Sequence, residues 1–210
     1  PLDRVWTPSL PDYGLWGGPL SWLDPATGAR KAYYRIVGDA SCYTLAHLEK
    51  QGLIAVGTSV YGGSGTKPKV SEVSLFLWDY TAEQKVWEGT LPDRPVSIWN
   101  ALLTGEDGRL YGTVRGGGPD VLFVFDPASR TFTHQSELPY GRPLDLGLQQ
   151  GPDGLIYGFT VTSIYTFDPE SHELSEVVRV NDGIKIAGPI ADQDIYFGTG
   201  PRLRAARLFD

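Results

Sequence analysis

The chain has 210 residues, a formal net charge of −7 and 12% aromatic residues. This length suits one large all-β domain or two small ones. The acidity excludes a nucleic acid as partner, because binding to a polyphosphate needs a basic surface. No apolar run approaches the length of a membrane span, so we expect a soluble chain with no membrane partner.

The composition also limits the chemistry of the chain. It contains no Met, so we expect that Pro1 is not a native start and that the chain was processed or cut from something longer. The single Cys42 excludes an internal disulfide and is interpreted as a buried structural thiol. The sequence assigns no compartment, and an extracytoplasmic location is compatible with it.

A repeated pattern of turns and strands organises the chain. Its clearest copy, residues 151–169, begins with Gly-Pro-Asp-Gly-Leu-Ile-Tyr-Gly and ends with Ile-Tyr-Thr-Phe-Asp-Pro. An Asp closes the third strand of each copy, every 42 to 55 residues, at Asp24, Asp79, Asp126, Asp168 and Asp210. A period in the forties with alternating strands is typical of propeller blades. We therefore predict an all-β fold, a β-propeller of about five four-stranded repeats, alone or as part of a larger propeller.

In chain order, the repeats of this single domain, residues 1–210, cover approximately residues 4–36, 42–91, 96–138, 144–180 and 184–210. In each, an inner strand leads into a hairpin, predicted as a type I′ turn at Asp107-Gly108 and Asp153-Gly154. The second strand carries an aromatic residue and a Gly, the third ends in an Asp-Pro type I turn, and the fourth is more polar. This gradient predicts buried inner strands and solvated outer ones.

The N-terminal residues allow two alignments. Residues 11–17 match residues 152–158 without a gap, which makes residues 4–10 the inner strand of the first repeat, and we favour this alignment. Alternatively, residues 5–12 resemble residues 86–93 and would form the outer strand that completes the last repeat and closes a ring. On the first alignment, that last outer strand must come from elsewhere, because an open sheet edge promotes aggregation.

These motifs resemble known propeller families. Residues 151–158 are similar to turns of bacterial NHL, gluconolactonase-type and streptogramin-lyase-like propellers, and residues 23–28 resemble quinoprotein-type blades. The resemblance implies the architecture only, because these motifs consist of residues that form turns and carry no activity. Gluconolactonase-type propellers bind a metal through Glu, Asn and Asp, for which Asn100, Asp145 and Asn181 would be the counterparts. We nevertheless predict no metal and no cofactor, because no His or Cys has ligand spacing.

A ligand site is expected at the mouth of the central channel. We define the mouth as the end of the blades that carries the loops between second and third strands and the loops between repeats; the opposite end is the base. The mouth loops hold slightly more basic than acidic residues, whereas the base is strongly acidic, so the mouth would attract anions. Alternatively, the acidic residues only serve the turns of the base. The predicted ligand-binding residues are Arg94, Arg115, Arg142, Tyr61, Tyr140 and Lys185.

The longest departure from the repeat is the mouth loop at residues 58–73, which is read either as a ligand-binding lid or as a disordered decoration. It would hold Tyr61, Lys67 and Lys69 over the channel. Tyr43 and Trp99 are also placed near the mouth. Most other aromatic residues are expected between blades, including Trp22, Trp78, Phe125 and Phe167.

Three functions remain open. The first is a carbohydrate-associated binding domain for acidic oligosaccharides or polysaccharides, in which Arg side chains pair with carboxylates unless they bridge neighbouring blades. The second is a polysaccharide lyase acting on uronate-containing glycans, with Tyr61 and Lys67 as candidate catalytic residues and Arg94 or Arg142 neutralising the enolate. The third is a non-catalytic protein-interaction scaffold. Further blades of a longer chain are the other expected partner.

Overall fold

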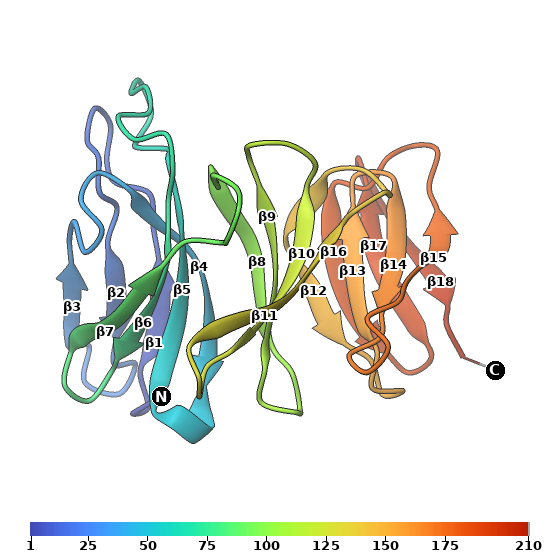
Figure 1. Cartoon of the computed structure of the whole chain (residues 1–210), viewed down its shortest axis with the longest axis horizontal. Helices are drawn as coiled ribbons and strands as arrows, with labels where there is room; N and C mark the ends of the chain where they lie inside the picture. Colours follow the sequence, from blue (N-terminus) through green and yellow to red (C-terminus); the bar gives the residue numbers. More distant parts are fainter. Residues whose placement is uncertain (210) are drawn as a thin grey trace.

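In the computed structural model, which describes residues 1–209, the chain forms a β-propeller in which five blades follow one another in an open array (Figure 1). One short 3-10 turn, Glu49–Gln51, interrupts the strands. Within the described residues, no helix has the length and apolar character needed to cross a membrane.

The blades are antiparallel sheets, and those of blades 2 and 3 are joined in one eight-stranded sheet through the pair Ser59 and Ile98. Blade 1 contains β1 (Val5–Pro8), β2 (Leu20–Leu23) and β3 (Arg30–Tyr33). Blade 2 contains β4 (Ser41–Leu48), β5 (Leu53–Ser59), β6 (Leu75–Asp79) and β7 (Gln84–Gly89). Blade 3 contains β8 (Ile98–Thr104), β9 (Leu110–Arg115), β10 (Val121–Asp126) and β11 (Thr131–Glu137). Blade 4 contains β12 (Pro143–Gln150), β13 (Ile156–Thr160), β14 (Ser163–Phe167) and β15 (Leu174–Arg179), and blade 5 contains β16 (Ile186–Ala191), β17 (Asp194–Thr199) and β18 (Arg202–Arg207).

Apolar side chains on both faces of the strands hold neighbouring blades together. Trp78 packs with residues of blade 1, Phe125 with residues of blade 2, and Phe167 with residues of blade 3. Trp22 packs on the other side of its sheet, toward blade 2. The predicted inter-blade position of these four residues is therefore confirmed, and burial of large aromatic surfaces is what joins the repeats.

The N-terminal strand does not lie where either alignment placed it. β1 pairs directly with β2, which is the place of the second strand in blades 2 to 4, and residues 9–19 form a mouth loop. β1 also lies at the opposite end of the array from blade 5, whose free edge is β18 (Figure 1). The gapless match was misleading, because residues 11–17 lie in this loop, where Gly14 and Gly17 have positive φ, whereas residues 156–158 belong to β13.

The Asp-Gly hairpins are not type I′ turns. Gly108 has a φ of 83°, but Asp107 is not among the residues with positive φ, and the N–H of Gly108 donates to the carbonyl of Gly105 at 2.9 Å. This is a type I turn followed by a left-handed Gly. Asp107 favours it because its carboxylate accepts hydrogen bonds from the N–H of Arg109 and from the phenol of Tyr111.

Candidate functional site

The inner strands of blades 2, 3 and 4 are irregular near the mouth. Their pairing with the neighbouring strand shifts at Tyr43 in β4, at Asn100 in β8 and over residues 144–147 in β12. Such bulges turn a side chain out of the regular alternation and are frequent beside functional sites. The same distortion in three consecutive blades therefore brings one polar residue per blade to the channel.

These three bulged residues meet on one carboxylate. The phenol of Tyr43 donates to Oδ2 of Asp145 at 2.7 Å, and Nδ2 of Asn100 donates to Oδ1 at 2.6 Å. Asp145 is exposed, whereas Asn100 is fully buried and its Oδ1 has no partner among the described residues. The cluster thus combines an accessible acceptor with a buried one that lacks a donor.

Two of the predicted site residues lie beside this cluster. Burial and the hydrogen bond to Asp145 raise the pKa of Tyr43 well above its ordinary value, while the charge of Arg115 opposes the shift and Tyr61 adds to it. Arg115 is half-buried and Tyr61 is exposed. Arg115 and Tyr61 therefore act electrostatically on Tyr43, which, like its hydrogen-bond partner Asp145, was not part of the predicted ligand-binding set.

The charges of three predicted arginines act on a second carboxylate at the mouth, that of Asp120. Burial raises the pKa of Asp120, and the charges of Arg115, Arg94 and Arg142 act in the opposite direction. Arg94 also donates to the carbonyl of Gly116, which fixes its guanidinium against the neighbouring loop. Arg142 is exposed, so it and Arg115 are the two arginines of this group with the fewest structural ties.

The remaining predicted residues lie further from the cluster or serve packing. The ring of Tyr140 stacks on Tyr165 and its phenol donates to the carbonyl of Leu174, so its aromatic face is used between blades 3 and 4. Lys185 is exposed at the start of blade 5. Trp99, which we placed near the mouth, is instead fully buried in the core against Phe123.

The long mouth loop of blade 2 packs against the mouth loop of blade 1. The backbones of residues 60–74 and 9–19 exchange hydrogen bonds, from Gly14 to Ser64 and from Gly63 to Leu15, both at 3.0 Å. Nε1 of Trp16 donates to the carbonyl of Lys67, and the ammonium of Lys69 lies 3.5 Å from the centre of the Trp16 ring. The loop is therefore held in place, with the side chain of Lys67 left exposed.

The residues implied by the gluconolactonase resemblance do not fit a metal site. Asn100 and Asp145 meet, but Asn181 lies in an exposed turn before blade 5. Both oxygens of Asp145 already accept hydrogen bonds, and residues 1–209 contain no group of three His, Cys, Asp or Glu side chains that could hold an ion. One carboxylate, one amide and one phenol are better suited to a ligand rich in hydroxyl groups.

The histidines form a contact that the sequence did not indicate. His134 on β11 and His172 in the turn after β14 come from neighbouring blades, and their rings stack with centroids 4.0 Å apart. Nε2 of His134 also lies within hydrogen-bond distance of Ser136. This contact is at the outer side of blades 3 and 4, so it takes no part in the mouth cluster.

Comparisons with known proteins support the fold. No protein-family model matches the chain, and no curated protein matches its sequence. Among solved structures, it is similar to the extracellular domain assigned to a one-component system of B. thetaiotaomicron, with a TM-score of 0.66 and 14% identity over 98% of this chain. The chain is also similar to the extracellular domain assigned to a hybrid two-component system of the same organism, with a TM-score of 0.63 and 16% identity over 97% of this chain.

A third similar structure is a gluconolactonase from Xanthomonas campestris, with a TM-score of 0.62 and 15% identity over 90% of this chain and 65% of that one. The chain spans only about a quarter of the length of the two extracellular domains, 26% and 25%. At these identities the likeness establishes the architecture, and activity has to be argued from the site.

Proposed function

We propose that this chain is a glycan-binding propeller domain whose ligand lies at the channel mouth, with a preference for acidic sugars. The observation that carries the proposal is the cluster in which Tyr43 and Asn100 both donate to the exposed carboxylate of Asp145, with the charge of Arg115 close by. Polar groups converging from three blades on one channel are the arrangement expected of a binding site.

Each residue has a distinct part in this proposal. Asp145, fixed by its two donors, would accept hydrogen bonds from sugar hydroxyls, and Oδ1 of Asn100 would gain a donor if the ligand or a water reached it. The guanidinium of Arg115, joined by the exposed Arg142, would pair with a sugar carboxylate. Tyr61, which is 46% exposed, supplies an aromatic face on which a sugar ring could lie.

The similar structures agree with a carbohydrate-related role. One is a gluconolactonase, and two are extracellular domains assigned to one-component and hybrid two-component systems. Recognition of a sugar outside the cytoplasm would be consistent with both kinds of relative.

Calorimetric titration with trigalacturonate and with neutral galactotriose tests the proposal. We expect tighter binding of the acidic sugar, a loss of at least about tenfold for that sugar alone in Arg115→Ala, and weaker binding of both sugars in Asp145→Asn. Arg179→Ala is the matched control, because Arg179 is an exposed arginine on the outer strand of blade 4. If neither sugar binds, the glycan proposal fails; if both bind equally, only the acidic preference fails.

A lyase acting on uronate-containing glycans is the second candidate. It is favoured by the influence of both Tyr61 and Arg115 on Tyr43, since β-elimination needs a proton acceptor and a cation that stabilises the enolate. The raised pKa of Tyr43 makes that phenol a poor base, which leaves Tyr61, with Lys67 as the other candidate. Ultraviolet absorbance of the unsaturated uronide during incubation with polyuronates would show the reaction, and Tyr61→Phe should abolish it. A flat trace would exclude this candidate.

A further inference from the structure

Two loops of the mouth, residues 9–19 of blade 1 and residues 60–74 of blade 2, lie backbone against backbone. Glycine makes this close approach possible, because a Cβ on Gly63 would collide with the carbonyl oxygen of Asp12. The hydrogen bonds between the two backbones complete the contact. We call these two segments the paired loops. Figure 1 shows the loop between β5 and β6 projecting above the other loops at this end of the array, so the paired loops form a fixed, raised part of the mouth.

The paired loops present one aromatic ring that is supported on one side and open on the other. The ring of Tyr13 lies against the other loop, since a Cβ on Gly65 would meet its Cζ at 2.7 Å. Gly65 also has a φ of 81°, a conformation that residues with a Cβ rarely adopt. Tyr13 is nevertheless 80% exposed. A ring supported in this way is already ordered before a ligand arrives, which lowers the entropy cost of binding.

Neighbouring residues connect the paired loops to the mouth cluster. Tyr61, the first exposed residue after β5, acts electrostatically on Tyr43, which donates to Asp145. The next residue is Gly62, where a Cβ would meet the carbonyl oxygen of Leu15 at 2.6 Å. The loop that begins beside the cluster is therefore the same loop that supports the exposed ring.

The paired loops differ from the mouth cluster in charge. Their charged side chains are two exposed carboxylates and two exposed ammonium groups, those of Asp12, Glu72, Lys67 and Lys69, so the two segments carry no net charge. The ammonium of Lys69 already lies over the ring of Trp16. What the paired loops offer a ligand is thus an aromatic face rather than an electrostatic field.

We propose that the paired loops bind further sugar residues of the glycan held at the mouth, with one sugar ring stacked on the open face of Tyr13. This inference rests on the proposed function and adds the size of the ligand, which is a chain of several sugars rather than a single sugar. Sugar rings have apolar C–H faces that pack on aromatic rings, a contact that needs no charge. The mouth cluster would select the acidic group, and Tyr13 would add affinity that grows with the length of the chain.

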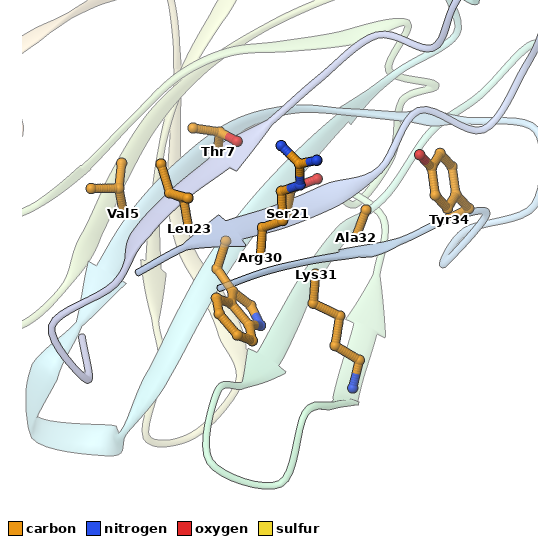
Figure 2. A pocket seen from close by; sticks show the side chains of 9 residues that line it. Val5, Thr7, Ser21, Leu23, Arg30, Lys31, Ala32 and Tyr34 are labelled. Atoms are coloured by element: carbon orange, nitrogen blue, oxygen red, sulfur yellow. The ribbon is translucent and has the colours of Figure 1, made fainter. Parts of the chain in front are cut away.

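The outer side of blade 1 is a different surface. Figure 2 shows the depression there, about 580 Å³ in volume, with Val5, Leu23 and Tyr34 among the side chains that line it. Both paired loops belong to the described residues, and neither contributes to this lining. Tyr13 instead contacts the loop of blade 2. Tyr34, which is 67% exposed, therefore provides a control tyrosine outside the proposed surface.

Calorimetric titration with digalacturonate and with hexagalacturonate tests this inference. We expect the wild-type protein to bind the longer sugar at least about tenfold more tightly. Tyr13→Ala should remove most of this gain and leave the affinity for digalacturonate unchanged. Tyr13→Phe keeps the ring and should bind both sugars as the wild type does, and Tyr34→Ala should also leave both affinities unchanged.

The other outcomes separate failure of this inference from failure of the proposed function. If neither galacturonate binds, both fail. If the two sugars bind equally well, the mouth site stands and its extension over the paired loops is wrong. A gain for hexagalacturonate that survives Tyr13→Ala, or that Tyr34→Ala also removes, would place the further sugars elsewhere.

Two more results would contradict the assigned role of the ring. An equal loss for both sugars in Tyr13→Ala would mean that Tyr13 acts on the mouth cluster and not on an extension of it. A Tyr13→Phe variant that behaves like Tyr13→Ala would assign the effect to the hydroxyl group instead of the ring face. Circular dichroism of each variant distinguishes these results from loss of the fold.

Discussion

The base and the mouth of the propeller use their carboxylates in different ways. At the base, Asp24, Asp126 and Asp168 accept hydrogen bonds from hydroxyl and N–H groups of their own turns, which lowers the pKa of each. At the mouth, Asp145 accepts its hydrogen bonds from two other blades, and burial raises the pKa of Asp120. These three base carboxylates thus stabilise the turns that hold them, whereas Asp145 brings separate blades together.

This difference accounts for the contrast between the acidic base and the more basic mouth. Asp24, Asp126 and Asp168 at the base are explained by the hydrogen bonds that they accept within their own turns. The mouth instead holds groups whose hydrogen-bonding capacity is incompletely used, such as Oδ1 of Asn100. Incomplete satisfaction weakens a fold but leaves groups available to a ligand, which is why we assign function to the mouth.

The largest expected effect is at the base, in Asp153→Ala. This change removes the acceptor of the Tyr157 phenol, which donates to it at 2.8 Å and belongs to a residue that is almost fully buried. An unpaired buried hydroxyl should cost about 1 to 3 kcal/mol of unfolding free energy, measured by urea denaturation. The double variant with Tyr157→Phe should recover part of that loss. Equal losses in the single and double variants would contradict the assigned role of the hydrogen bond.

A smaller effect distinguishes two tyrosines of blade 4. Tyr157→Phe should destabilise by about 1 kcal/mol, because it removes a satisfied hydroxyl. Tyr165→Phe should be neutral or stabilising by up to about 1 kcal/mol, because the Tyr165 hydroxyl is buried with no partner among the described residues. Thermal unfolding of the two variants side by side decides this. A Tyr165→Phe protein that melts well below the wild type would show that its hydroxyl is satisfied.

The smallest expected effect is a difference in pH dependence. The pKa of Asp126 is lowered by folding, so its contribution to stability is present above the unfolded-state pKa, ordinarily near 3.8, and is lost as pH falls below it. The pKa of Asp120 is raised by folding, so its ionised form opposes folding at neutral pH. Asp126→Asn should therefore flatten the acid limb of the stability curve, and Asp120→Asn should raise stability at neutral pH. Urea midpoints between pH 3 and 7 check both, and parallel curves for the two variants would refute the distinction.

Features set by neighbours in the sequence could be predicted from it. The turns at Asp126-Pro127 and Asp168-Pro169 depend on residues a few positions apart, and the structure shows these turns as well as the predicted aromatic residues between blades. The N-terminal alignments failed because short matches of residue type do not specify strand pairing, and β1 pairs with β2. Asp210, the last of the repeated Asp residues, lies outside the described residues.

Features set by distant contacts could be predicted only in part. Trp99 was misplaced because the bulge at Asn100 shifts the alternation of β8, which a regular two-residue period does not show. The mouth cluster joins Tyr43 to Asp145 and Asn100 to Asp145 across 102 and 45 residues. A single sequence contains no direct signal for such pairs. The one available sign is that Tyr43, Asn100 and Asp145 are each the third residue of an inner strand.

Measuring sugar affinity and stability together in Arg115→Ala and Asp153→Ala tests the central claim most directly. If the mouth binds the ligand and the base holds the fold, Arg115→Ala should lose at least about tenfold in affinity for trigalacturonate while its unfolding free energy hardly changes. Asp153→Ala should show the reverse, with lower stability and unchanged affinity at a temperature where it is folded. If Arg115→Ala binds trigalacturonate as tightly as the wild type, the ligand site is not at the mouth.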